Sequence, residues 1–233
     1  MLEAGGWGLL GASSLVLGAV LSFTGLIRGR LLRLITAFGA GVLISAVAYD
    51  LVAEAVDVSA TGISVAAGFA LGSLVFYAGS ALVERWTKGH SQGTGILFGA
   101  ALDGIPESAV LGVSLVAGSG ISVAVLVAIL ISNVPEALAS TTDLAAAGRS
   151  RAWILTVWIV IAVLSGLIAA ISFSLLGKAD GEIIAFIEAF AAGAILTMLA
   201  DDMIPDAFVD GDKLPGVATA AGFAVAALLS FST

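Results

Sequence analysis

The sequence predicts an all-α membrane protein with eight transmembrane helices in a 3+2+3 arrangement. Of its 233 residues, 60% are hydrophobic and only 11% are charged, and the mean hydropathy is +1.14. Soluble domains carry about 25% charged residues. The apolar runs suit helices, which need about 20 residues to cross a bilayer, and they lack the alternation of a transmembrane barrel. We therefore expect residues 1–233 to form a single transmembrane domain with no soluble catalytic module.

Eight apolar runs, each bounded by charged or turn-forming residues, are the expected spans. They cover residues of about 5–27, 32–56, 61–84, 93–117, 121–147, 151–177, 181–208 and 214–231. The first residues lack the basic region and the cleavage site of a secretory signal, so we expect them to lead directly into the first span.

The positive charges predict an orientation for these spans. Eight of the nine Lys and Arg residues fall after the first, third, fifth and seventh spans: Arg28, Arg30, Arg33, Arg85, Lys88, Arg149, Arg151 and Lys213. Only Lys178 falls on the other side. Because basic connections stay in the cytoplasm, we expect a multi-pass protein of the cell membrane with both termini outside.

The residue types that are rare or missing narrow the function. The chain has no cysteine, which excludes disulfides, thiolate metal ligands and thiol nucleophiles. Its net charge of −8 argues against nucleic-acid partners and favours cations as ligands. The single histidine, His90, is expected in the third connection as a solvated loop residue.

Two segments of the chain repeat each other. Residues 38–55 align without gaps with residues 190–207, which lie 152 positions later, and each copy carries two carboxylates four residues apart. These are Asp50 and Glu54 in the second span and Asp202 and Asp206 in the seventh. Since the two spans run in opposite directions, the copies have inverted topology, which many transporters use for alternating access. The sequences around Pro106 in the fourth span and Pro135 in the fifth form a second, shorter repeat.

Carboxylates in the fourth and fifth spans predict a cation site at the middle of the membrane. A charged side chain there costs at least about 2.5–3.5 kcal/mol, so it normally faces a cavity, a partner or an ion. Residues four apart share one face of a helix. The candidate ligands are therefore Asp103 and Glu107 on one helix and Ser132, Asn133 and Glu136 on the next.

The prolines beside these carboxylates supply further candidate ligands. An in-helix proline frees the carbonyl four residues earlier and bends the helix. Pro106 and Pro135 would free the carbonyls of Leu102 and Ile131.

The alternative roles for these side chains are structural. A buried glutamate beside a proline can be protonated or hydrogen-bonded and serve only helix packing. Asp50, Glu54, Asp202 and Asp206 can be relay ligands at the mouths of a pathway or solvated residues at helix ends.

The small and aromatic residues indicate packing and membrane interfaces rather than cofactor binding. The glycines expected at close helix contacts are Gly39, Gly41, Gly68 and Gly72. The tryptophans expected near the membrane interfaces are Trp7, Trp86, Trp153 and Trp158.

Taken with these motifs, the chain resembles the ZIP (Zrt-, Irt-like) divalent metal transporters over essentially its whole length. In that family the two motifs read His-Asn-x-Pro-Glu-Gly and His-Asn/Asp-x-Pro-Glu-Gly, and their side chains bind zinc or related metals within the membrane. The matching stretches here are Asp103-Gly-Ile-Pro-Glu107-Ser and Ser132-Asn-Val-Pro-Glu136-Ala. Both glutamates and Asn133 match, whereas Asp103 and Ser132 replace the two histidines. In the second span, Asp50 likewise stands where family members often carry histidine.

The resemblance implies a carrier that moves a divalent cation, zinc or a related ion, toward the cytoplasm. It implies no enzymatic activity and no permanently bound cofactor. Members of the family are often homodimers. An all-oxygen site favours harder ions such as Mn²⁺, Mg²⁺ or Ca²⁺, so zinc specificity is the part of the resemblance that the replaced histidines affect most.

Three other functions remain open at this stage. A carrier of a proton-coupled organic solute would use Glu107 and Glu136 as titrating groups. An intramembrane aspartyl protease would need a second aspartate opposite Asp50, and no Gly-x-Gly-Asp motif supplies one. A relative that keeps the fold for binding or sensing would not transport at all.

Overall fold

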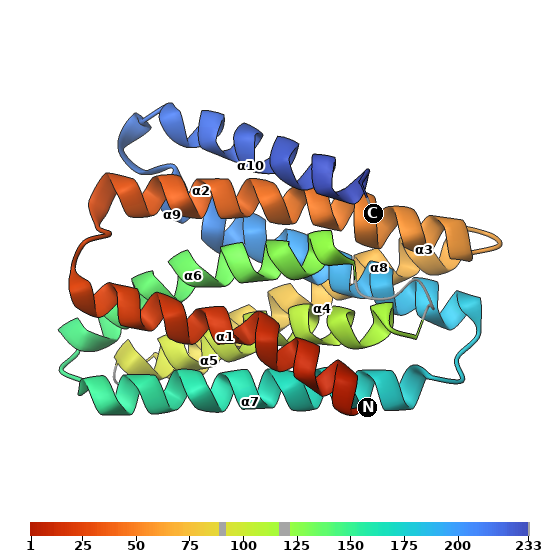
Figure 1. Cartoon of the computed structure of the whole chain (residues 1–233), viewed down its shortest axis with the longest axis horizontal. Coiled ribbons are helices and arrows are strands. Elements are labelled where there is room, and N and C mark those ends of the chain that lie inside the picture. Colours follow the sequence, from red (N-terminus) through yellow and green to blue (C-terminus); the bar gives the residue numbers. More distant parts are fainter. Residues whose placement is uncertain (89–91, 117–121, 233) are drawn as a thin grey trace.

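The computed structural model describes residues 1–88, 92–116 and 122–232, and within them the chain is helical with no strand (Figure 1). Its elements are α1 (Leu2–Thr24), α2 (Gly29–Ala46), the π-helix η1 (Val47–Val52), α3 (Ala53–Val58), α4 (Ile63–Thr87), α5 (Gln92–Ser114), α6 (Val123–Ala146), α7 (Arg151–Leu176), α8 (Gly181–Met198), the π-helix η2 (Leu199–Met203), α9 (Ile204–Ala207), the 3₁₀ helix η3 (Val209–Gly211) and α10 (Leu214–Ser230). The expectation for His90 concerns a position outside the described residues.

Six of these helical segments are long and apolar enough to cross a membrane. They are Leu2–Thr24, Gly29–Val58, Ile63–Thr87, Val123–Ala146, Arg151–Leu176 and Gly181–Ala207. Two of them are continuous through a π-helix, α2–η1–α3 and α8–η2–α9. The all-helical membrane class is therefore confirmed. By length and composition the described residues support six spans rather than eight, because α10 has only 17 residues and the side chains of residues 92–94 and 97 in α5 are not described.

Short polar and glycine signals set where several helices begin and end. The side chains of Ser122, Ser150 and Asp180 accept hydrogen bonds from backbone N–H groups in the first turns of α6, α7 and α8. These bonds satisfy N–H groups that have no partner within a helix. Gly25 ends α1 in a left-handed conformation, with φ of 69°, which a glycine adopts without steric cost.

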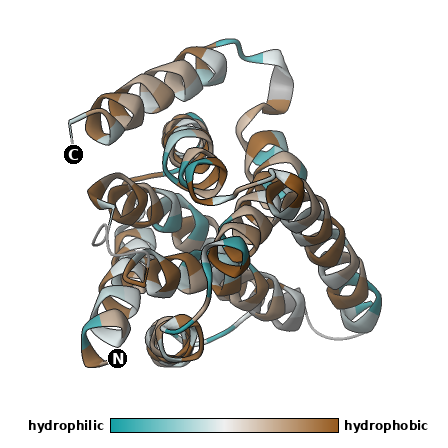
Figure 2. Ribbon diagram, turned by 90° about the vertical axis from the view of Figure 1, so that its right-hand side faces the viewer, coloured by the Kyte–Doolittle hydropathy of each residue, from teal (hydrophilic) through white to brown (hydrophobic). Residues whose placement is uncertain are grey.

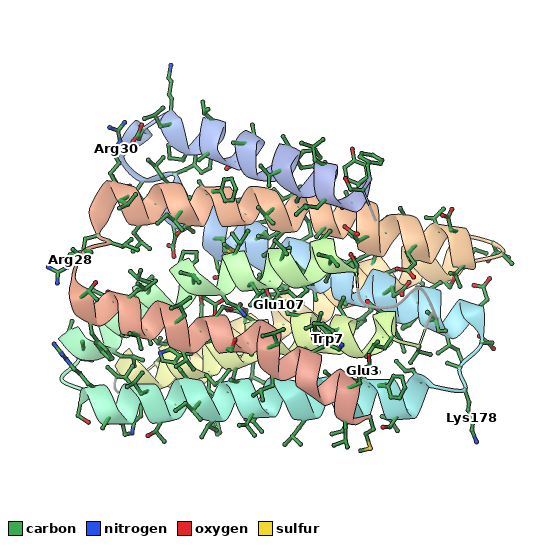
Figure 3. The ribbon with its side chains drawn as sticks, in the orientation of Figure 1. Glu3, Trp7, Arg28, Arg30, Glu107 and Lys178 are labelled. Atoms are coloured by element: carbon green, nitrogen blue, oxygen red, sulfur yellow. The ribbon has the colours of Figure 1, made fainter. Side chains whose placement is uncertain are left out.

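The bundle has two chemically different ends. Figure 3 shows Arg28 and Arg30 at one end and Glu3 and Lys178 at the other. We name the first the basic end, because the eight basic residues other than Lys178 all lie in the connections at that end or in the helix ends beside them. We name the second the terminal end, because α1 starts and α10 finishes toward it (Figure 1).

The helices pack in pairs whose backbones approach closely. α4 lies along α8, and α10 lies along α2. A Cβ added at Gly72 of α4 would overlap the carbonyl oxygen of Phe190 in α8, and one at Gly222 of α10 would overlap that of Phe38 in α2. Gly41 and Gly68 also face backbone atoms of these partner helices, and a Cβ added at Gly39 would lie 3.3 Å from the Cα of Ser132 in α6. The prediction of close-packing glycines is therefore confirmed at all four positions.

The outward faces of the bundle are apolar. Figure 2, which looks along the bundle, shows hydrophobic residues over the outer sides of the helices. Leu74, Leu82 and Leu228 are more than half exposed there, as expected for residues that face lipid.

One tryptophan does not lie at a membrane interface. Trp158 is only 1% exposed, and its Nε1 donates to Thr141 Oγ1 at 2.9 Å between α7 and α6. The interfacial prediction is wrong for this residue because a buried hydroxyl satisfies the indole N–H within the bundle. Trp86, in contrast, is 70% exposed near the basic end.

Candidate functional site

Glu107 is buried in the middle of the bundle, where α5 faces α6 (Figure 3). Its side chain is 4% exposed, and its Oε1 has no hydrogen-bond partner among the described residues. The Ser132 hydroxyl lies within hydrogen-bonding distance of the Glu107 carboxylate and of the Ile129 carbonyl, which is 3.1 Å away. Because a hydroxyl has one proton, it donates to only one of them at a time. Glu107 is thus a buried group whose hydrogen-bonding capacity the protein does not fill.

Asn133 connects this region to α1. Its Nδ2 donates to the carbonyl oxygen of Gly11 at 3.3 Å. The amide oxygen is then the acceptor that remains for a ligand. Glu107, Asn133 and Glu136 line one small cavity of about 10 Å³, about the space of a single water molecule.

A larger cavity of about 310 Å³ lies at the basic end. Its walls come from the start of α2 and α5 and from the last turns of α4, α6 and α8–η2–α9. The carboxylates that line it are Glu84, Asp103, Glu136, Asp202 and Asp206. Glu136 borders both cavities, so its side chain lies between the larger cavity and the buried Glu107 region.

The exposure of the carboxylates falls from the mouth of the cavity inward. Glu84, Asp202 and Asp206 are exposed, Asp103 and Glu136 are half-buried, and Glu107 is buried.

Neighbouring carboxylates in this series are close enough for their charges to interact. Asp206 and Glu84 act on Asp202, Asp202 acts on Glu136, and Glu136 is also subject to the charges of Asp103 and Glu107. Such a row of oxygen ligands, running from solvent to a buried carboxylate, suits a hard divalent cation.

Two of the predicted site residues lie elsewhere. Asp50 is at the opposite, terminal end, where its Oδ1 accepts from Ser122 Oγ at 2.8 Å and its Oδ2 accepts from Ser230 Oγ at 2.7 Å. Glu54 is half-buried about one turn further along the same helical segment, in α3. The structure therefore brings Asp202 and Asp206 to the cavity and keeps Asp50 in hydrogen bonds that join α6 and α10 to η1.

Apolar packing fills the bundle between Glu107 and the terminal end. The buried residues there come from α2, from α5 after Glu107 and from α6 before Ser132: Leu43, Val47, Val110, Leu111, Val125 and Leu126. Within the part of the chain that the structure describes, the larger cavity thus lies at the basic end and apolar side chains lie between Glu107 and the terminal end.

Within the described residues, no three or more His, Asp or Glu side chains converge closely enough to hold a metal ion as they stand. Binding of one cation by Asp103, Glu107 and Glu136 together therefore requires their side chains to rotate.

The structure adds carboxylates that the sequence reasoning did not select. Glu84 lines the cavity, and the charge of Asp143 acts on Asp206 near its mouth. Glu188 on α8 is buried at 2% exposure, and the charge of Glu54 acts on it. The sequence gives little signal for Glu84 and Asp143, since an acidic residue near the end of a span is usually solvated. Glu188 could have been found, because it is a carboxylate inside an otherwise apolar run.

The two aspartates of the repeat share an unusual backbone setting. Asp50 lies in η1 (Val47–Val52) and Asp202 lies in η2 (Leu199–Met203). The two π-helices start 152 positions apart, which is the offset of the sequence repeat. π-Helical turns are rare and occur often at functional sites, so the local geometry of the two copies agrees with their sequence similarity.

The fold and the cavity define a multi-pass helical membrane protein with a carboxylate-lined cavity that reaches its middle. No protein-family model matches the chain. The chain is 30% identical over 205 residues to an Arabidopsis thaliana protein named "Putative zinc transporter". The alignment covers 83% of this chain and 32% of that protein, so the chain spans about a third of the length of this relative. The similarity is to a transporter, which is not an enzyme.

Proposed function

We propose that this protein is a ZIP-like transporter that carries a divalent cation, zinc or a related ion, across the cell membrane. The observation that supports it most is the row of carboxylates that runs from the basic end through Asp202 and Glu136 to the buried Glu107. The two Pro-Glu motifs of α5 and α6 and the similarity to a plant protein named as a zinc transporter support it further.

In this proposal the primary ligands are Glu107, Glu136, Asp103 and Asn133, and Ser132 is a weaker one. The charges of these carboxylates offset the cost of removing a cation from water only if their oxygens replace most of its hydration shell. The buried, unpartnered oxygen of Glu107 and the free amide oxygen of Asn133 are placed for that role. Asp202 and Asp206 pass the cation between this site and the basic end.

The chain crosses the membrane eight times in the proposed topology, with the basic end in the cytoplasm. The structure then corresponds to an inward-open state, because its larger cavity opens at that end. Transport requires a second state in which the same midplane site opens outward. The inverted copies, spans one to three and six to eight, supply that state by exchanging their conformations.

Cation flux into proteoliposomes tests the proposal. Zn²⁺, Mn²⁺, Fe²⁺, Cd²⁺ and Mg²⁺ are supplied in parallel to the unaltered protein, to Glu107→Gln/Glu136→Gln and to the matched control Glu3→Gln. Glu3 is an exposed carboxylate at the terminal end, outside both cavities. We expect saturable uptake of at least one ion that the double variant abolishes and the control retains.

Two results would contradict the proposal. Uptake that is equal in the double variant would remove the two glutamates from the pathway. Absence of uptake for every ion would leave the fold with a different solute or with a binding role.

A further inference from the structure

The residues that line the open cavity have counterparts at the other end of the bundle. At the offset of 152 positions, the cavity residues Thr36, Met198, Asp202, Met203 and Asp206 correspond to Glu188, Ala46, Asp50, Leu51 and Glu54. Thr36 lies in α2 and its counterpart Glu188 lies in α8, whereas the other four cavity residues lie in α8–η2–α9 and their counterparts lie in α2–η1–α3. Each copy therefore contributes residues to both regions.

The helices packed against the two copies follow the same relation. Phe190 of α8 faces Gly72 of α4, and its counterpart Phe38 of α2 faces Gly222 of α10. Gly222 follows Gly72 by 150 positions, and at that offset Ser230 of α10 corresponds to Ser80 of α4.

The two ends differ at the paired aspartates. Among the described residues, Asp50 is half-buried and accepts hydrogen bonds from Ser122 and Ser230, whereas its counterpart Asp202 is exposed in the open cavity. The Ser230 hydroxyl lies 2.7 Å from Asp50 Oδ2 and 3.1 Å from the Ala226 carbonyl, and we take the shorter contact as its bond; Ser80, its counterpart, lines the open cavity together with Asp202. The bonds from Ser230 and Ser122 to Asp50 join α10 and the start of α6 to η1 at the terminal end, and we name them the Asp50 latch.

Glu188 is the residue that this region leaves unexplained. It is 2% exposed, and neither of its carboxylate oxygens has a hydrogen-bond partner among the described residues. The nearby charge of Glu54 adds to the cost of its burial. A buried carboxylate without a partner is expensive, and packing needs no acid at this position, since its counterpart Thr36 is a neutral residue at the edge of a cavity.

We propose that Glu188 is a cation-binding residue of a second cavity, which opens at the terminal end when the Asp50 latch releases and which Asp50 and Glu54 also line. This inference rests on the proposed function, since it names the residue that receives the cation on the outer side. In the conformation seen here, no described protein group bonds to the Glu188 carboxylate, and in the open state it would bind water or a divalent cation.

Single-cysteine accessibility tests the second cavity without measuring transport. The chain has no cysteine, so Ala46→Cys and its counterpart Met198→Cys each introduce one thiol. A membrane-impermeant maleimide is applied from each side, with and without the latch substitution Ser230→Ala. The matched control is Ser232→Ala. The Ser232 hydroxyl donates to the Leu228 carbonyl four residues earlier, at 2.6 Å.

We expect Met198→Cys to react from the basic side, and Ala46→Cys to react from the terminal side. Ser230→Ala should speed the second reaction and slow the first, whereas Ser232→Ala should change neither. Failure of Ala46→Cys to react from the terminal side in both backgrounds would overturn the second cavity.

Uptake kinetics then test the role of Glu188. For Glu188→Gln we expect the KM of the transported cation to rise about tenfold, which corresponds to about 1.4 kcal/mol of binding free energy, with kcat within about twofold. Glu188→Asp, which keeps the charge, should restore most of the affinity. The matched control is Glu182→Gln, whose carboxylate on the same helix is held by Ser59, Ser64 and the Ala60 N–H and whose loss should leave KM unchanged.

The outcomes separate this inference from the proposed function. An unchanged KM in Glu188→Gln, in a protein that transports, would overturn the role of Glu188 alone. Labelling of Ala46→Cys in a protein that moves no cation would contradict the proposed function while leaving the second cavity in place.

Discussion

Glu107 shows how a functional residue can weaken the fold that carries it. Its Oε1 is buried without a partner among the described residues, and leaving a buried polar group unsatisfied costs about 1–3 kcal/mol. Glu107→Met replaces the carboxyl group with an apolar side chain of similar length. We expect this variant to melt a few degrees above the unaltered protein in detergent, since about 1 kcal/mol shifts Tm by roughly 2–4 °C in a chain of this size, and to lose cation uptake.

The same experiment separates the functional role of Glu107 from a packing role. If the carboxyl group served mainly to hold α5 to α6, its removal would lower Tm. Ser114→Ala is the matched control, because Ser114 lies buried on the same helix and its hydroxyl bonds to the Val110 carbonyl within that helix.

The close contact of α4 with α8 depends on single glycines. A Cβ at Gly72 would overlap the backbone carbonyl of Phe190, which cannot move aside as a flexible side chain would. We expect Gly72→Ala to destabilise the protein by about 1–3 kcal/mol, as overpacking does. Thermal unfolding in detergent measures this.

The control for that substitution is Gly6→Ala in α1, where a Cβ would meet nothing within 4 Å. There we expect a gain of up to about 1 kcal/mol, because alanine is the better helix former. A Gly72→Ala protein as stable as the unaltered one would mean that α4 and α8 can separate at no cost.

An ion pair joins the first turn of α2 to the segment just before α10, and its strength depends on pH. Arg30 Nε lies 2.7 Å from Asp212 Oδ2, and Nη2 lies 3.3 Å from Oδ1. The hydrogen bond from Arg30 holds the pKa of Asp212 below its ordinary value. A carboxyl group with a lowered pKa in the folded state stabilises the protein above its unfolded pKa of about 3.9 and loses that contribution as the pH falls through the folded pKa.

Asp212→Asn should therefore lower Tm slightly at pH 7, and the difference from the unaltered protein should vanish as the pH falls below 4. The effect is small because Arg30 is largely exposed and water screens the pair. A Tm difference that persists unchanged at low pH would show that the loss does not come from the ion pair, since asparagine keeps an oxygen that can accept from the Leu214 N–H.

At the scale of the whole molecule, composition and charge placement were enough to predict an all-helical membrane protein. The predicted spans and the helices agree because long apolar runs and their charged boundaries are local features of the chain. The six spans supported by length and composition fall short of eight at α10, whose apolar stretch is short, and at α5, where some side chains lie outside the described residues.

The site was predictable only in part, for a physical reason. The pairing of Glu107 with Ser132 and Asn133 follows from motifs on adjacent helices. The sequence does not predict that Asp202 lies in an open cavity while Asp50 is hydrogen-bonded at the other end, because this depends on which conformation the bundle adopts. The π-helices were also not predictable, since no proline or glycine occupies η1 to mark it. The burial of Trp158 likewise depends on a hydrogen bond to Thr141 on another helix, which the periodicity of the sequence does not reveal.

The orientation of the bundle decides what the open cavity means. Eight of the nine basic residues lie in or beside the connections at one end, and the rule that basic connections stay inside predicts that this end is cytoplasmic. Lys178→Cys and Lys213→Cys test this, because both residues are exposed, lie at opposite ends and stand in a chain without other thiols. In intact cells we expect an impermeant maleimide to label Lys178→Cys at once and Lys213→Cys only after permeabilisation. The reverse pattern would place both termini inside and would make the cavity of Asp202 and Glu136 an outward-facing one, so that the Asp50 latch would lie on the cytoplasmic side instead.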